Sequence, residues 1–102
     1  MMKNNAGMMQ QIMQMQKQLK KTQKELEKAT VIGVSGDGAI QVILTGSQKF
    51  HDVKIDREKI KDLSADKLEK LFGQAISDAL DKSRDLMKEK LGPLGGGLGM
   101  KL

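Results

Sequence analysis

The chain has 102 residues, which bounds it to one small domain with a limited hydrophobic core. It has no cysteine and a single histidine, so the composition excludes a disulfide framework, a zinc–cysteine site and a thiol nucleophile. Most of the formal net charge of +5 falls within residues 1–29, which hold six lysines and two glutamates, and this segregation favours an anionic partner.

The N-terminal part of the chain predicts a helix over residues 8–29, preceded by a flexible segment over residues 1–7. Apolar positions recur with alternating spacings of four and three, the a/d pattern of a helix that packs along one narrow seam. The helix would be roughly 33 Å long at about 1.5 Å per residue, more than a small domain can cover. We therefore expect part of the seam to contact another helix, such as one of a partner chain. The seam residues are Met8, Ile12, Met15, Leu19, Thr22, Leu26 and Ala29.

A stripe of five lysines lies on the side of this helix opposite the seam. The stripe spans roughly 17 Å and can follow the phosphates of a nucleic-acid duplex. A solvated coiled-coil face shows the same pattern, and so does a basic, methionine-rich helix that binds a membrane surface or an acidic partner. The residues alone leave these alternatives open. The lysine stripe consists of Lys17, Lys20, Lys21, Lys24 and Lys28.

The middle of the chain predicts a three-stranded antiparallel meander. Asp37-Gly38 supplies the positive φ angles of a tight hairpin. The middle strand alternates, and it places Ile43 on the face opposite its other large apolar residues. The expected strands cover residues 30–35, 39–45 and 50–55.

The C-terminal part predicts a short turn capped by Asp56 and then a second long helix over residues 65–91 with Ser64 as its N-cap. Gly92-Pro93 is expected to end this helix and leave a disordered, glycine-rich tail over residues 92–102. The apolar positions of the helix cover an arc of about 200°, wider than one sheet face requires. This excess predicts a dimer, with interface candidates Ile43, Phe72, Ala75, Ile76, Ala79 and Leu80.

No motif in the chain indicates catalysis. His51 has no serine or carboxylate placed by a recognisable motif to work with it. The glycines around Asp37 precede a strand rather than the helix that a phosphate-binding loop needs. The carboxylates after the third strand lack the spacing of a metal-binding loop. We expect no catalytic residue, no metal, no cofactor and no small-molecule substrate.

The sequence also lacks the apolar stretch of a signal peptide and any span suited to a bilayer. The segment over residues 4–16 is uncharged, but it is rich in Asn and Gln. We therefore expect a soluble intracellular protein and regard a membrane partner as unfavoured.

Three stretches together resemble the YbaB/EbfC family of bacterial nucleoid-associated proteins. They are VIGVSGDGAIQVILTG from Val31 to Gly46, VKID from Val53 to Asp56, and LEKLFGQAISDAL from Leu68 to Leu80. Their order and spacing carry the resemblance, which spans nearly the whole chain as a single domain over residues 8–91. It implies an α+β fold with an αβββα protomer, a tweezer-like homodimer, and binding of double-stranded DNA with low sequence specificity.

The resulting hypothesis is a non-enzymatic, homodimeric, nucleoid-associated protein of the cytoplasm and nucleoid, with a role in nucleoid organisation and gene regulation. The lysine stripe would contact DNA, with Arg84 and Lys88 of the second helix as further candidates. The alternative is a dimeric adaptor or chaperone-like protein that binds peptide or membrane partners through its methionine-rich basic helix.

Overall fold

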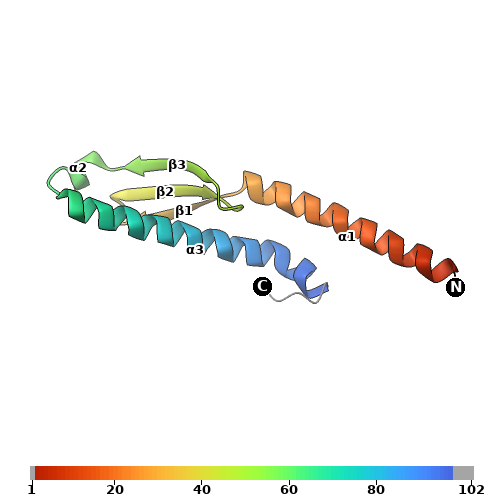
Figure 1. The fold of residues 1–102 in the computed structure, drawn as a ribbon. Helices are drawn as coiled ribbons and strands as arrows, with labels where there is room; N and C mark the ends of the chain where they lie inside the picture. Colours follow the sequence, from red (N-terminus) through yellow and green to blue (C-terminus); the bar gives the residue numbers. More distant parts are fainter. Residues whose placement is uncertain (1, 98–102) are drawn as a thin grey trace.

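A computed structural model describes residues 2–97 and shows an elongated molecule with principal extents of 73, 22 and 16 Å (Figure 1). The predicted α+β fold, with three antiparallel strands between two long helices, is confirmed. A long α3 lies along the sheet, and α1 runs away from the end of the sheet (Figure 1). The elements are α1 (Met2–Lys28), β1 (Thr30–Ser35), β2 (Ile40–Thr45), β3 (Phe50–Ile55), α2 (Arg57–Ile60) and α3 (Ala65–Gly97).

The sheet is an antiparallel meander in the order β1-β2-β3. The β1–β2 turn has the predicted positive φ angles, 57° at Asp37 and 85° at Gly38. The β2–β3 pairing is interrupted by a bulge between Ile43 and Leu44. The sheet has two edge strands, β1 and β3, which differ in how α3 covers them.

The core lies between the sheet and α3, which packs on β1 and β2 rather than on β3. Gly33 of β1 allows a very close approach, because a Cβ atom there would lie 2.6 Å from the Cβ of Ala79 and even closer to the backbone of α3. The buried residues of this core are Ala39, Ile40, Val42, Leu44, Ala75 and Ala79.

This packing corrects part of the predicted dimer interface. Ala75 and Ala79 have no exposed surface within the single chain, because both are buried in its own core. They are therefore not available to a second copy. The sequence pattern could not separate the part of the helix arc that packs on the chain's own sheet from the part left over.

The β1 edge is covered by two side chains of α3. The Val34 N–H donates to Asp78 Oδ2 at 2.9 Å, and Lys82 Nζ donates to the Ile32 carbonyl at 2.8 Å. Asp78 and Lys82 also form an ion pair at 3.0 Å. Two hydrogen bonds hold the pKa of the Asp78 carboxyl below its ordinary value. The larger effect comes from the Val34 N–H and the smaller from Lys82. These contacts satisfy backbone groups that would otherwise be free to pair with another strand.

Asp78 should therefore contribute to stability in a pH-dependent way. Its folded-state pKa is lowered, so its contribution is present above the unfolded-state pKa, near 3.9, and is lost as the pH falls through the folded-state pKa. We expect Asp78→Asn to lower the free energy of unfolding at pH 7 and to have a shrinking effect below about pH 4. Urea unfolding of both proteins across this range measures the difference. A constant difference at every pH would contradict the assignment.

Among the described residues, the buried side chains of α1 lie near its C-terminal end. Thr22 and Leu26 are buried there. A Cβ at Gly46 would lie 2.9 Å from Leu26 Cδ2 and 3.0 Å from Leu86 Cδ2 of α3, so this turn packs closely against both helices. Lys90 of α3 reaches Glu25 at 3.8 Å. The part of the seam closest to the sheet is therefore buried by contacts within the same chain.

The helix ends differ from the prediction more than the strands do. α1 begins at Met2, so residues 2–7 belong to the helix and not to a flexible segment. Extending an existing helix adds one hydrogen bond per residue without a new nucleation step. Because the apolar pattern starts at Met8, it does not reveal this extension towards Met2. β2 begins at Ile40, one residue later than predicted.

α3 continues to Gly97, so the predicted stop at Gly92-Pro93 is wrong. A proline removes one helical hydrogen bond, but it marks a probable boundary rather than a certain one. The tail predicted as disordered over residues 92–102 is thus helical as far as Gly97, and residues 98–102 lie outside the described part. The predicted caps are confirmed, since Asp56 accepts from Glu58 N–H at 3.1 Å and Ser64 from Lys67 N–H at 3.2 Å.

Candidate nucleic-acid interface

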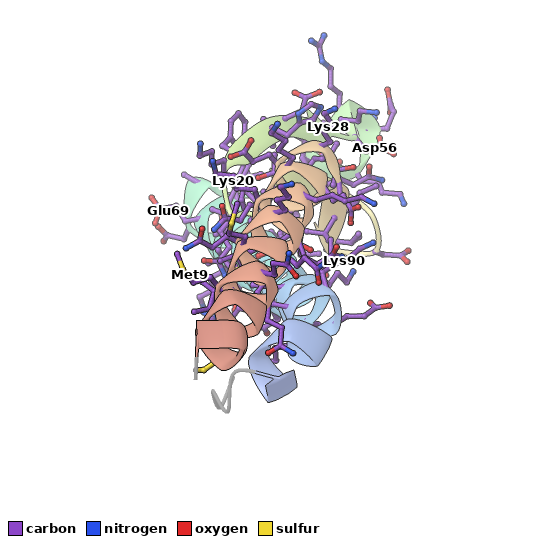
Figure 2. The ribbon with its side chains drawn as sticks, turned by 90° about the vertical axis from the view of Figure 1, so that its right-hand side faces the viewer. Met9, Lys20, Lys28, Asp56, Glu69 and Lys90 are labelled. Carbon is purple, nitrogen blue, oxygen red and sulfur yellow. The ribbon has the colours of Figure 1, made fainter. Side chains whose placement is uncertain are left out.

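The five residues of the lysine stripe are all exposed on α1. The opposite side of the same helix carries Thr22 and Leu26, which are buried against the rest of the fold. Figure 2 looks along α1 and shows Lys20 and Lys28 on the outer side of the helix, away from α3. The structure therefore places the lysines on the side of α1 opposite the seam, as the helix periodicity predicts.

The lysines of the stripe form no ion pair with any other described residue. The ion pairs among residues 7–92 involve Lys61, Lys82, Arg84 and Lys90, and none includes a lysine of the stripe. Glu25, an acidic residue of α1, is turned towards Lys90 of α3. Five unpaired ammonium groups on one exposed helix face form a site for a polyanion.

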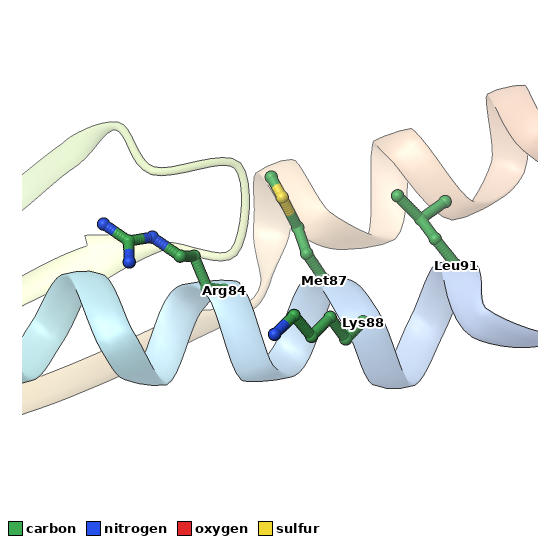
Figure 3. A pocket seen from close by; sticks show the side chains of 4 residues that line it. All are labelled: Arg84, Met87, Lys88 and Leu91. Atoms are coloured by element: carbon green, nitrogen blue, oxygen red, sulfur yellow. The ribbon is translucent and has the colours of Figure 1, made fainter. Parts of the chain in front are cut away.

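Arg84 and Lys88, the candidates on α3, lie on a different surface. They flank Met87 and Leu91 in a shallow pocket of about 160 Å³, where both apolar side chains rise from α3 towards α1 (Figure 3). Met87 and Leu91 also share a hollow with Leu26 of the seam. Arg84 and Lys88 therefore lie on the seam side of α1. Within one chain they are not part of the same surface as the lysine stripe. Arg84 also forms an ion pair with Asp81, with 3.7 Å between Arg84 Nη1 and Asp81 Oδ1.

An exposed apolar surface remains where α3 leaves β3 uncovered. Phe50, Val53 and Ile55 are 65%, 38% and 40% exposed, and we call them the β3 patch. Ile76 of α3 is 44% exposed. It stands two positions from Asp78, about 200° round the helix, and so lies on the side away from the β1 edge. Ile76 and the β3 patch thus border the same uncovered part of the molecule.

The remaining interface candidates are less exposed than predicted. Phe72 and Leu80 are partly buried and pack against the core, and Ile43 is only 9% exposed on the outer face of the sheet. The sequence pattern assigned no residue of β3 to the interface. The exposure of β3 depends on which strands α3 covers, and strand alternation alone does not reveal this.

Among the described residues, no helix is long and apolar enough to cross a membrane. No group of three or more potential metal-ligating side chains was found in the same part of the chain. His51 is exposed on β3. The described surface offers charged and apolar patches.

Comparison with known proteins gives one consistent result. The model of the YbaB/EbfC DNA-binding family matches residues 2–98. A nucleoid-associated protein of Dictyoglomus turgidum is 36% identical over 97 residues, covering 95% of this chain and 93% of that protein. One from Rhodospirillum centenum is 40% identical over 97 residues, covering 95% and 91%.

The fold is also found in a solved structure. The crystal structure of the uncharacterized protein HP0035 from Helicobacter pylori matches with a TM-score of 0.73, covering 85% of this chain and 91% of that one. At 16% sequence identity, this similarity concerns the fold alone.

Proposed function

The chain belongs to the YbaB/EbfC DNA-binding family, and from this premise we propose that it is a nucleoid-associated protein that binds double-stranded DNA as a homodimer with low sequence specificity. The observation that carries the proposal is the lysine stripe, five exposed lysines on one face of α1 that form no ion pair among the described residues. The relatives named as nucleoid-associated proteins support the same role.

The lysines bind by neutralising phosphates. Each lysine that pairs with a phosphate releases about one condensed counterion from the duplex, and this release supplies affinity. Phosphates are the same at every base pair, so the contact positions the protein without reading sequence. Low specificity follows from this chemistry. The proposed roles are nucleoid organisation and gene regulation at bound sites. The proposal contains no catalytic step.

The homodimer is supported by the uncovered apolar surface. The β3 patch and Ile76 would be buried by a second copy, whereas in a monomer they remain in water. Asp78 and Lys82 form hydrogen bonds with the backbone of Val34 and Ile32 at the β1 edge, which favours the β3 side for association. A two-fold dimer carries two lysine stripes and can contact two stretches of DNA backbone.

A charge in the β3 patch should dissociate this dimer. We expect Val53→Asp to give a folded monomer of about half the wild-type mass, because an unpaired charge buried in an interface costs several kcal/mol. Light scattering at micromolar concentration measures the mass. The matched control is Lys54→Asp, one residue along β3 and therefore on the other face of the sheet, which should remain dimeric. A wild-type protein that is itself a stable monomer would contradict the homodimer.

The function is tested by titrating the protein against duplex DNA at several salt concentrations. Phosphate binding predicts that the logarithm of affinity falls linearly and steeply with the logarithm of salt concentration. The alternative, a dimeric adaptor or chaperone-like protein that captures an apolar partner through its methionine-rich helix, predicts little salt dependence and no duplex binding. Absence of duplex binding at low salt would refute the proposed function.

A further inference from the structure

The N-terminal part of α1 carries an apolar surface that the described part of the chain leaves exposed. Met8 and Ile12, which continue the seam, are 61% and 52% exposed, whereas Leu26 on the same seam is 3% exposed. The seam thus changes from buried to exposed along a single helix. We call Met8 and Ile12 the tip seam.

The reason for the exposure is that α1 extends beyond α3. Figure 1 shows the N-terminal half of α1 projecting past the end of α3. Contacts of α1 with α3 are found around Glu25 and Leu26, close to the sheet. A projecting helix of this length is marginally stable in water by itself. Gly7 within it has a low helix propensity, and nothing lies within 4 Å of where its Cβ would be. A partner on the tip seam would stabilise the projecting turns.

The charge distribution indicates what kind of partner fits. Residues 4–16 contain no charged side chain, so the turns that carry Met8 and Ile12 offer a phosphate backbone or an anionic membrane far less charge than the lysine stripe does, with Lys3 the one cationic side chain N-terminal to them. The tip seam also faces away from the lysine stripe, at about 100° per residue. A duplex or a membrane that rests on the lysines would therefore not touch Met8 and Ile12. The same apolar seam of a second copy meets neither difficulty.

We propose that the tip seam is a second self-association surface, on which the α1 tips of two molecules pack against each other and couple adjacent dimers on DNA. The two helices would meet as the inner part of the seam meets α3, by apolar side chains along one narrow line. An antiparallel overlap keeps the two lysine stripes apart. The coupling to DNA rests on the proposed function, whereas the tip contact itself does not.

The size of the surface sets the strength of the contact. Two side chains per tip bury far less than the roughly 1,200 Å² typical of a stable interface. The contact should therefore be weak in dilute solution. Molecules bound side by side on one duplex have a high effective concentration, at which a weak contact is populated. The expected consequence is cooperative binding to long duplexes and not to a duplex that holds a single dimer.

The test compares two double variants of matched chemistry. Met8→Gln with Ile12→Gln removes the tip seam, and glutamine retains helix propensity. Met9→Gln with Met13→Gln makes a similar change one residue along, about 100° round the helix towards the lysines. Met9 and Met13 are 65% and 55% exposed, similar to the tip seam. Circular dichroism verifies that α1 remains helical in both.

Binding is measured on a short duplex that holds one dimer and on a long duplex that holds many, and sedimentation velocity follows the free protein at high concentration. We expect the tip-seam variant to reduce the Hill coefficient on the long duplex to 1 and to abolish concentration-dependent association beyond the dimer. Its affinity for the short duplex should be unchanged. The Met9 and Met13 variant should resemble the wild type in all three measurements.

Each other outcome overturns the inference in a distinguishable way. Non-cooperative binding by the wild type, or equal effects of the two variants, would show that the tip seam has no coupling role. Conversion of the tip-seam variant to monomers would place the seam in the primary dimer. Wild-type binding to phosphatidylglycerol vesicles that only the tip-seam variant loses would assign the tip to a membrane. Failure of every protein to bind the short duplex would instead refute DNA binding, and sedimentation alone would then decide the tip contact.

Discussion

Gly33→Ala is expected to lower the free energy of unfolding by about 3 kcal/mol, a large share of the stability of a domain this small. The added Cβ would lie 2.6 Å from the Cβ of Ala79 and closer still to the carbonyl oxygen of Ala75 and the amide nitrogen of Ala79. These last two are backbone atoms of a helix and cannot rotate away. α3 would have to lift from β1, which opens the core along its length. Urea unfolding followed by circular dichroism measures the loss.

A second glycine of the same fold supplies the control. Gly73 lies inside α3, is exposed, and has nothing within 4 Å of the position of its missing Cβ. Gly73→Ala should therefore raise the free energy of unfolding by up to about 1 kcal/mol, because alanine favours a helix interior. Opposite signs for the two substitutions are expected. A tolerated Gly33→Ala would show that α3 packs less closely on β1 than the structure has it.

The sheet was predictable because its signals are local. Alternation in β2, positive φ at Asp37 and Gly38, and a cap at Asp56 each act over a few residues, and all are found in the structure. The helix ends were less predictable, since a helix can extend through weak formers or through Pro93 when the hydrogen bonds on either side remain.

The surfaces were predictable only where one element decides them. The lysine stripe follows from helix periodicity alone, and its exposure on α1 agrees with that periodicity. Whether the predicted interface residues are exposed depends on which strands α3 covers. Ala75 and Ala79 were assigned to an interface because an apolar arc does not say which of its residues the chain's own sheet will bury. The β3 patch needed the same tertiary information.

Replacing Lys17, Lys20, Lys21 and Lys24 together by glutamine should weaken duplex binding for every sequence alike. All four side chains are exposed and point away from the buried part of the seam, so helix content and dimer mass should not change. If each lysine releases about one counterion, the plot of log affinity against log salt concentration should flatten by roughly 3–4 per engaged chain. Affinity at low salt should fall by orders of magnitude as a result.

The matched control removes the same charge elsewhere. The control lysines are also exposed, but they lie on β3, after α2 and on the first turns of α3, and Lys61 pairs with Glu58; they are Lys54, Lys61, Lys67 and Lys70. Their replacement by glutamine changes net charge by the same amount, so a general electrostatic effect would weaken binding in both variants. A contact made by the lysine stripe flattens the salt dependence only in the first variant. If neither slope changes, DNA is held elsewhere, and Arg84 and Lys88 beside the Met87–Leu91 pocket become the residues to replace. A loss confined to one DNA sequence would instead require contacts to base edges, which lysine–phosphate pairing does not supply.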